Sequence, residues 1–316
     1  MSGSFTRAAT WLARRNHALL AAAIFLIGTA EMLLVRMVPA SLPFWMPYEF
    51  SWGVFLATAF AVVWYARGFA ITGADHRPSR WRRLAFFLGV GLIYGSMQTY
   101  ADYAAQHMFF IHRLQHLVLH HSGPFLVALG DPAATIARGM PPGLKKRLNA
   151  VWITRPLGLI QQPAIATFLF VGLIYLWPAP PVHFYAMLDP RLYTVMNWSV
   201  TIDGLLFWAL ILDPRPKPLA RLTYGSRALL CFAIMPPQIL IGAVVAFATK
   251  DFFEVYAICG RILPMTGLQD QQLAGLILWI PGAMMSVVGA VLVLNFMRLN
   301  DEKNAYCSTG RTPALA

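Results

Sequence analysis

Runs of roughly twenty apolar residues recur along this chain of 316 residues, separated by segments rich in arginine and lysine. About twenty helical residues cross the ~30 Å hydrocarbon layer of a bilayer. Hydrophobic residues make up 58% of the chain and charged residues only 12%, a balance typical of polytopic membrane proteins. We therefore expect an all-α integral membrane protein with about eight transmembrane helices in a single domain, residues 1–316. The expected spans are 17–35, 51–69, 84–103, 109–130, 157–177, 192–212, 227–249 and 271–297, with a short cytoplasmic tail over 298–316.

The distribution of basic residues predicts how these spans are oriented. Loops on the cytoplasmic side of a membrane carry an excess of Lys and Arg. With the N-terminus inside, the outer segments keep few of the 25 basic residues, and we therefore expect both termini in the cytoplasm. In a soluble protein, the net charge of +12 would suggest that the protein binds nucleic acid. Here the basic residues lie between the apolar runs and orient the spans, so we expect membrane lipid as the partner and no nucleic acid. The outer basic residues are Arg36, Arg113, Arg191, Lys250 and Arg261.

One expected span, within Gln106 to Pro132, holds five of the eight histidines. Met108, His112, His116 and His120 recur at every fourth residue, so each lies about one helical turn from the next and neighbouring pairs can share a ligand. The direction of these side chains rotates around the helix by roughly 40° from one to the next. This rotation favours two adjacent metal sites, or a row of sites along the helix, over one site that collects all four side chains. Neutral imidazole and thioether suit a soft ion such as Cu(I).

A structural explanation of these histidines is also open. A membrane helix can use a histidine to hydrogen-bond a neighbouring helix. Several ionisable groups along one span are nevertheless costly in hydrocarbon and mark functional sites. We therefore expect copper ligands, with His112 and His116 first, then His120 and His121.

The predicted topology places the beginning of this helix at the outer surface and His120 and His121 near the middle of the membrane. Arg113 is expected at the level of the lipid headgroups. His107 and His183, the latter in the outer loop PAPPVHFYAMLDP, are candidates to complete a site. Other polar candidates, as supporting or packing residues, are Asp102 before the helix, Asn197 and Asp203 within a later span, and Asp270. For Asp203 three roles stay open: pairing with another helix, orienting a ligand histidine, or carrying a proton.

Two segments of the sequence point to a family. HRLQHLVLHHSGPFLVALG, His112 to Gly130, resembles the H-x-x-Q-H-L-L-L…A-P-P-L-L-V-L-G signature of the CtaG family, the assembly factors for caa-type cytochrome c oxidase. DQQLAGLILWIPG, Asp270 to Gly282, resembles the D-Q-Q-L-A-G-L-I-M-W-V-P-G segment near the end of that family. GLLFW, Gly204 to Trp208, is a weaker third match, and the order of the three agrees.

The resemblance implies a multi-span protein of the bacterial inner membrane that helps to deliver copper to a haem-copper oxidase. His112 and His116 fall on the paired histidines of the family. The sixth span departs from the family pattern, because Tyr193, Met196 and Asn197 stand where an H-x-x-E-H-type element is expected. A second set of ligands is therefore absent, or is replaced by Met196, His120 and His121.

Three classes of function remain open. The first is an assembly factor that captures Cu(I) at the outer face, with oxidase subunits and a periplasmic copper chaperone as partners. The second is a membrane haem protein, for which intramembrane histidine is the usual axial ligand. The third is a transporter of copper or protons along the histidine ladder. No nucleotide loop or hydrolase triad is present in the sequence, and we therefore expect no enzyme.

Overall fold

The computed structural model describes residues 16–38 and 42–309, and this part of the chain folds into helices without β-strands. Arg7, Arg14, Arg15 and Arg311, which contribute to the predicted charge bias, lie outside the described residues. The helices from the first span to the histidine segment are α2 (His17–Met37), α3 (Trp52–Ile71), η2 (Ala74–His76), α4 (Arg80–Gln98), α5 (Tyr100–His107), α6 (Phe109–His116), η3 (Leu117–Ser122) and α7 (Gly123–Leu129). The remaining helices are α8 (Ala133–Gly139), α9 (Pro142–Leu148), α10 (Val151–Ile160), α11 (Pro163–Leu176), α12 (Pro180–Leu188), α13 (Pro190–Ile211), α14 (Tyr224–Ala233), α15 (Met235–Ala246), α16 (Val255–Cys259) and α17 (Gly267–Thr309).

Long apolar helices make this chain a membrane protein. Within the described ranges, five helices are long and apolar enough to cross a bilayer: α2, α3, α13, the Tyr224–Ala246 stretch of α14 and α15, and α17. The bent pair of α10 and α11 makes six if it is one span. The predicted count of about eight spans and the cytoplasmic termini remain predictions. α4 begins with a cluster of arginines, and the α6–η3–α7 segment is interrupted by a change of helix type.

Several predicted boundaries differ from the structure for local reasons. The span expected over 84–103 ends at Gln98, because Thr99 is extended and its side chain caps the separate helix α5. The span expected over 157–177 is a pair bent by 71°, with Pro163 opening α11. Within the span expected over 227–249, α14 ends before Pro236 at the start of α15. α17 continues through the expected tail as far as Thr309.

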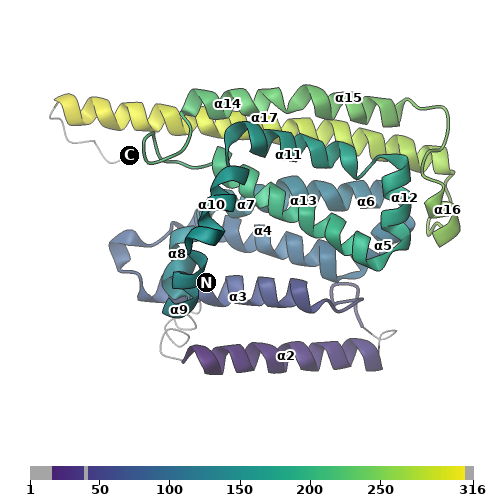
Figure 1. Ribbon diagram of the computed structural model, residues 1–316, viewed down its shortest axis with the longest axis horizontal. Helices are drawn as coiled ribbons and strands as arrows, with labels where there is room; N and C mark the ends of the chain where they lie inside the picture. Colours follow the sequence, from purple (N-terminus) through teal and green to yellow (C-terminus); the bar gives the residue numbers. More distant parts are fainter. Residues whose placement is uncertain (1–15, 39–41, 310–316) are drawn as a thin grey trace.

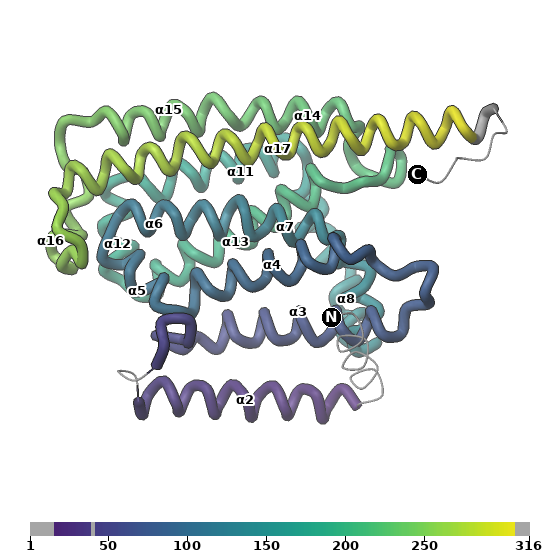
Figure 2. Tube along the Cα trace, turned by 180° about the vertical axis from the view of Figure 1, so that it is seen from behind, coloured from purple at the N-terminus to yellow at the C-terminus, as the bar shows by residue number. Residues whose placement is uncertain are grey.

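The long helices lie side by side, so that the connecting segments gather at two opposite ends of the molecule (Figure 1). One end carries α8, α9 and the late turns of α17, and the other carries α5, α12 and α16, as the view from behind also shows (Figure 2). The segment formed by α6, η3 and α7 runs between these ends and packs against α4, α13 and α17. The histidine-rich helix is therefore the centre of the bundle.

Candidate functional site

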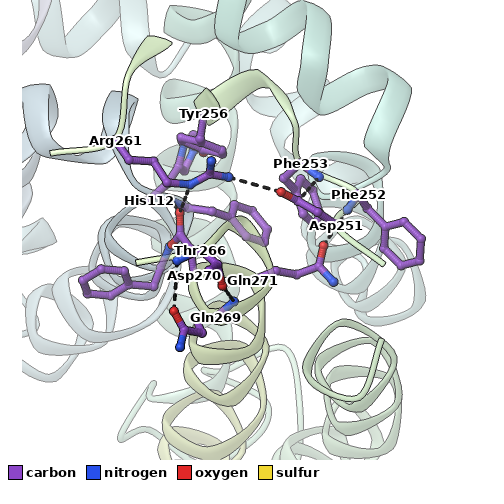
Figure 3. Close-up of polar contacts among 12 residues, drawn as sticks. His112, Asp251, Phe252, Phe253, Tyr256, Arg261, Thr266, Gln269, Asp270 and Gln271 are labelled. Carbon is purple, nitrogen blue, oxygen red and sulfur yellow. Dashed lines mark hydrogen bonds and ion pairs between the residues drawn. The ribbon is translucent and has the colours of Figure 1, made fainter. Parts of the chain in front are cut away.

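The histidine-rich helix begins at a buried carboxylate from another element. Met108 has extended backbone dihedrals and separates α5 from α6. Asp270, at the start of α17 and fully buried, accepts hydrogen bonds from the backbone N–H groups of Phe109 (3.0 Å) and Phe110 (2.8 Å). Arg261 lies beside this carboxylate, with 3.5 Å between Arg261 Nε and Asp270 Oδ2, and also reaches Asp251 (Figure 3). Asp270 therefore caps α6, because it satisfies N–H groups that a helix start leaves without partners.

His112 and His116 face each other on successive turns of α6. Their Nε2 atoms are 3.0 Å apart, and both side chains are buried. Asn197 Oδ1, on α13, lies 3.2 Å from His116 Nε2. An amide oxygen can only accept a hydrogen bond, so His116 carries its proton on Nε2.

A chain of hydrogen bonds fixes the proton position of His112 from the other side. The Trp177 carbonyl only accepts, so His183 Nδ1 donates to it across 3.0 Å and His183 Nε2 is left as an acceptor. Tyr256 donates its hydroxyl proton to His183 Nε2 at 2.9 Å, and its oxygen accepts from His112 Nδ1 at 2.9 Å. His112 Nε2 therefore carries no proton, and its lone pair accepts a hydrogen bond from His116 Nε2.

A cavity of about 280 Å³ leads from the molecular surface toward this pair. Glu49 and Thr194, at its mouth, are exposed, whereas Asn197, which contacts His116, is only 3% exposed. Asp102 and Met187 also line the cavity. The cavity opens at the end of the molecule that carries α5 and α12, and we call it the vestibule.

Asp102 sits in a wall of the vestibule within a network of donors. Its Oδ1 accepts from Tyr193 Oη at 2.8 Å and from Gln115 Nε2 at 2.6 Å. Burial raises the pKa of Asp102 to about 6, against the opposing effect of these hydrogen bonds. The carboxyl group is thus poised to change its charge near neutral pH.

Below the first pair, the helix widens into a π-helical turn at η3 and buries two more histidines. His120 Nε2 lies 2.9 Å from Asp203 Oδ2 on α13, and His121 Nε2 lies 3.1 Å from Gln238 Nε2 on α15. In a regular α-helix two adjacent side chains point in directions about 100° apart and so face different neighbours. His120 and His121 are nevertheless both nearly inaccessible. Isolated π-helical turns occur frequently at functional sites.

The GLLFW segment of α13 packs directly on this π-helical turn. A Cβ atom at Gly204 would lie 2.5 Å from the carbonyl oxygen of His120. Trp208 Nε1 donates to the same carbonyl at 3.2 Å. The glycine therefore permits the close approach, and the tryptophan satisfies a carbonyl at the irregular turn.

The structure brings some predicted site residues together and separates others. His112, His116 and His183 share one cluster, and His183 lies on α12 rather than in an open loop. The predicted regular stack is wrong at Met108, because the extended backbone there interrupts the helix. His107 stays on α5, where its Nδ1 contacts the carbonyl of Tyr103 at 2.8 Å.

The structure also shows the surroundings of Arg113, Asp203 and Met196. Arg113 is only 3% exposed and packs over the Phe109 ring, with 5.1 Å from its Cζ to the ring centroid, so its side chain does not extend to the molecular surface, as an arginine that reaches out to lipid headgroups would. Asp203 contacts His120 on a neighbouring helix, which agrees with the first of the three roles left open for it, pairing with another helix. Met196, which stands in the altered part of the sixth span, is fully buried within an apolar cluster.

Sequence reasoning missed Tyr256 and Gln238, which hold His112 and His121. Tyr256 lies in a short loop helix and Gln238 in a long apolar span, and neither has a spacing that links it to the histidines. Tyr193, one of the positions at which the sixth span departs from the family pattern, donates a hydrogen bond to Asp102. Only their placement in the fold reveals these contacts.

Comparison with known families settles the membership of the chain. The sequence profile of the cytochrome c oxidase caa3 assembly factors (Caa3_CtaG) matches residues 63–298. The chain belongs to this family of oxidase assembly factors. The match includes the α6–η3–α7 segment, GLLFW and the DQQLAG segment, which together build the centre described above.

Relatives in mycobacteria extend this comparison. Uncharacterised proteins of Mycobacterium bovis and Mycobacterium tuberculosis are each 28% identical over 236 residues, which is 68% of this chain and 34% of theirs. A protein of Mycobacterium leprae is 26% identical over 214 residues, 63% of this chain and 31% of its own. The chain thus spans about a third of the length of the curated relatives it matches. No solved structure matches it significantly.

Within the described part of the chain, no group of three or more His, Cys, Asp or Glu side chains is arranged to hold a metal ion. The pair His112 and His116 is nevertheless compatible with one soft ion. Metal–nitrogen bonds of about 2.0–2.1 Å allow two nitrogens 3.0 Å apart to bind the same ion at an angle near 95°. His112 Nε2 is ready to bind, whereas His116 must first move its proton from Nε2 to Nδ1.

Proposed function

We propose that this oxidase assembly factor captures Cu(I) between His112 and His116 and passes it to a subunit of a haem-copper oxidase. The proposed site faces the outer side of the bacterial inner membrane. A periplasmic copper chaperone supplies the ion, and transfer proceeds by exchange of ligands, without a catalysed covalent step.

The facing Nε2 atoms of the two histidines carry this proposal. Two imidazole nitrogens already lie 3.0 Å apart, close enough to share one ion, and His112 Nε2 carries no proton. Soft neutral ligands prefer Cu(I) to hard cations. Met187 is a third soft donor nearby, since its Sδ lies 3.8 Å from Tyr256 Oη beside His112.

The vestibule provides a route for the ion. It runs from exposed Glu49 past Asp102 and Met187 to Asn197, which contacts His116. Carboxylates at the mouth of a cavity raise the local concentration of cations. In this proposal a cation enters along acidic and thioether groups and replaces the hydrogen bond between the two histidines.

The cavity at the lower histidines weighs against the haem alternative. It measures only about 30 Å³, whereas cofactor pockets begin at roughly 300 Å³. A haem at His116 or His120 would require the surrounding helices to separate. Copper requires no such movement.

Metal binding by the purified protein tests the proposal. The protein in detergent is loaded with Cu(I) or Ag(I), freed of excess ion and analysed for metal and for a Soret band. We expect close to one ion per chain and no Soret band, and we expect His112→Ala/His116→Ala to lose the ion. His107→Ala is the matched control, because this histidine lies outside the cluster, and it should retain the ion.

Two outcomes would contradict the proposal. Wild type that binds no soft ion after loading would leave the histidines as groups that hydrogen-bond neighbouring helices. Equal loading of wild type and the double variant would place the ion elsewhere. If the metal result is as expected, deletion of the gene should lower the copper content and activity of the oxidase, and the double variant should fail to restore them.

A further inference from the structure

The helix before α11 presents an apolar face that the rest of the protein does not cover. Within the described part of the chain, α10 (Val151–Ile160) has no buried residue. Trp152 is 75% exposed and Leu159 is 53% exposed, and residues seven apart on a helix lie on the same face. Such a face is unfavourable in water, whereas a helix at a membrane surface buries it at the boundary of the headgroups and the acyl chains.

α10 lies across the direction of the neighbouring span rather than along it. It is bent by 71° relative to α11, and α11 packs against α13 in the bundle. The 14 residues of α11 rise by about 21 Å, and α10 at this angle adds only about 5 Å in the same direction. Figure 1 shows α10 on the side of the bundle that carries α8 and α9. α10 therefore contributes little to crossing the bilayer and follows its surface.

Four basic side chains accompany this helix without a counter-charge from the protein. Lys145, Lys146 and Arg147 form the last turn of α9, just before α10, and Arg155 lies within α10. All four are exposed, and none of them forms an ion pair with another residue that the structure describes. The sequence has no Asp or Glu over residues 132–188. The charge of these side chains is therefore available to a partner outside the protein.

We propose that the segment of α9 and α10 lies on the cytoplasmic surface of the membrane and binds anionic phospholipid. The basic side chains contact the phosphate groups, while Trp152 and Leu159 enter the boundary of the acyl chains. A cluster of basic residues beside an exposed apolar helix favours anionic over zwitterionic lipid. An acidic soluble protein would also neutralise the charges, but α10 follows the membrane surface, where lipid is already in contact with it. The proposal does not depend on copper binding.

Exchange of backbone amides in nanodiscs tests this surface. The full-length protein is placed in discs of phosphatidylcholine alone or in discs that also contain phosphatidylglycerol, and hydrogen–deuterium exchange of residues 142–160 is measured by mass spectrometry. We expect exchange in this segment to be about 10-fold slower in the discs with phosphatidylglycerol, because the attraction of several basic residues to the lipid opposes local opening. Sodium chloride should reduce the difference, since salt screens this attraction.

Variants of the segment separate its two contributions. Lys145→Gln/Lys146→Gln/Arg147→Gln should remove the difference between the two kinds of disc, because the contacts with the headgroups are lost. Trp152→Ser/Leu159→Ser should exchange faster than wild type in both kinds of disc, because the apolar face no longer enters the lipid. All five side chains are exposed, so these changes leave the packing of the bundle intact.

A matched control removes three exposed charges from other places in the chain. Arg191→Gln/Lys250→Gln/Lys303→Gln should preserve the difference seen in wild type. Equal exchange of wild type in the two kinds of disc, or a difference that survives the triple substitution in α9, would overturn the proposal. Equal slowing in phosphatidylcholine discs after addition of sodium phosphate would show that a soluble anion binds instead of a lipid, and would overturn it as well.

Discussion

At the scale of single residues, the site depends on where protons lie. The carbonyl of Trp177 determines the tautomer of His183, which determines the direction of the Tyr256 hydroxyl and hence the free nitrogen of His112. Groups that orient a ligand in this way typically change metal affinity 10–100-fold when they are removed. Tyr256 is therefore a positioning residue for His112.

Replacing Tyr256 tests this role. Tyr256→Phe removes the hydroxyl group, leaves the ring and frees His112 to carry its proton on either nitrogen. We expect Ag(I) affinity to fall by about 10-fold or more, and nitrogen NMR of labelled histidine should show that His112 no longer has a single tautomer. Unchanged affinity with an unchanged tautomer would mean that other contacts orient His112.

Asp102 gives the vestibule a pH-dependent contribution to stability. Its pKa is raised by burial from 3.8 to about 6, so the folded protein binds a proton more tightly than the unfolded chain. The resulting stabilisation is complete below the unfolded pKa and is lost as the pH rises through about 6. It amounts to about 3 kcal/mol in total, of which about 1 kcal/mol should disappear between about pH 5 and pH 7.

Thermal unfolding of wild type and Asp102→Asn measures this contribution. The variant cannot titrate at this position, so the unfolding midpoint of wild type should fall relative to that of the variant as the pH increases from about 5 to 7. A difference that stays constant or grows with pH would contradict the raised pKa.

At the scale of elements, the π-helical turn and α13 form one unit. The carbonyl of His120 faces α13, where Gly204 leaves room for it and Trp208 donates to it. Asp203, one residue before the glycine, contacts the imidazole of the same histidine. Close packing of α13 therefore holds both the backbone and the side chain of His120.

A methyl group at Gly204 should disturb this unit. Gly204→Ala places Cβ against the His120 carbonyl, and overpacking of this kind costs about 1–3 kcal/mol. Thermal unfolding in detergent measures the loss. Gly172→Ala in α11 is the matched control, because a Cβ there meets nothing within 4 Å, and it should be neutral or slightly stabilising. Equal effects of the two variants would show that α13 moves aside without cost.

The elements show what a sequence pattern can and cannot predict. Apolar runs predicted α2, α3 and α13 closely, because hydrophobic length alone defines such helices. The histidine spacing assumed a regular helix and could not indicate the break at Met108, which depends on Asp270 some 160 residues away. Tyr256 and the burial of Arg113 were equally hidden, since both follow from contacts between distant segments.

At the scale of the whole molecule, the basic side chains and the opening of the vestibule lie at opposite ends. Most of the basic side chains belong to segments at one end of the bundle (Figure 1). These segments are the connection from α3 into α4, the stretch with α8, α9 and α10, the connection from α13 into α14, and the late part of α17. The vestibule opens at the other end, beside α5 and α12. Positive segments remain in the cytoplasm, so this arrangement predicts that the vestibule faces outward.

Labelling of single cysteines in intact cells tests the predicted orientation. Asn149 follows α9 at the basic end and Leu263 follows α16 at the vestibule end, and both are exposed. In a background with Cys259→Ser, which removes a partly exposed native thiol at the vestibule end, and Cys307→Ser, which removes the thiol of the expected cytoplasmic tail, Leu263→Cys should react with a thiol reagent that cannot cross the inner membrane. Asn149→Cys should react only after the cells are opened, because its basic surroundings lie in the cytoplasm. The reverse pattern would place the vestibule and the histidine pair on the cytoplasmic side, so that copper would have to be supplied from within the cell.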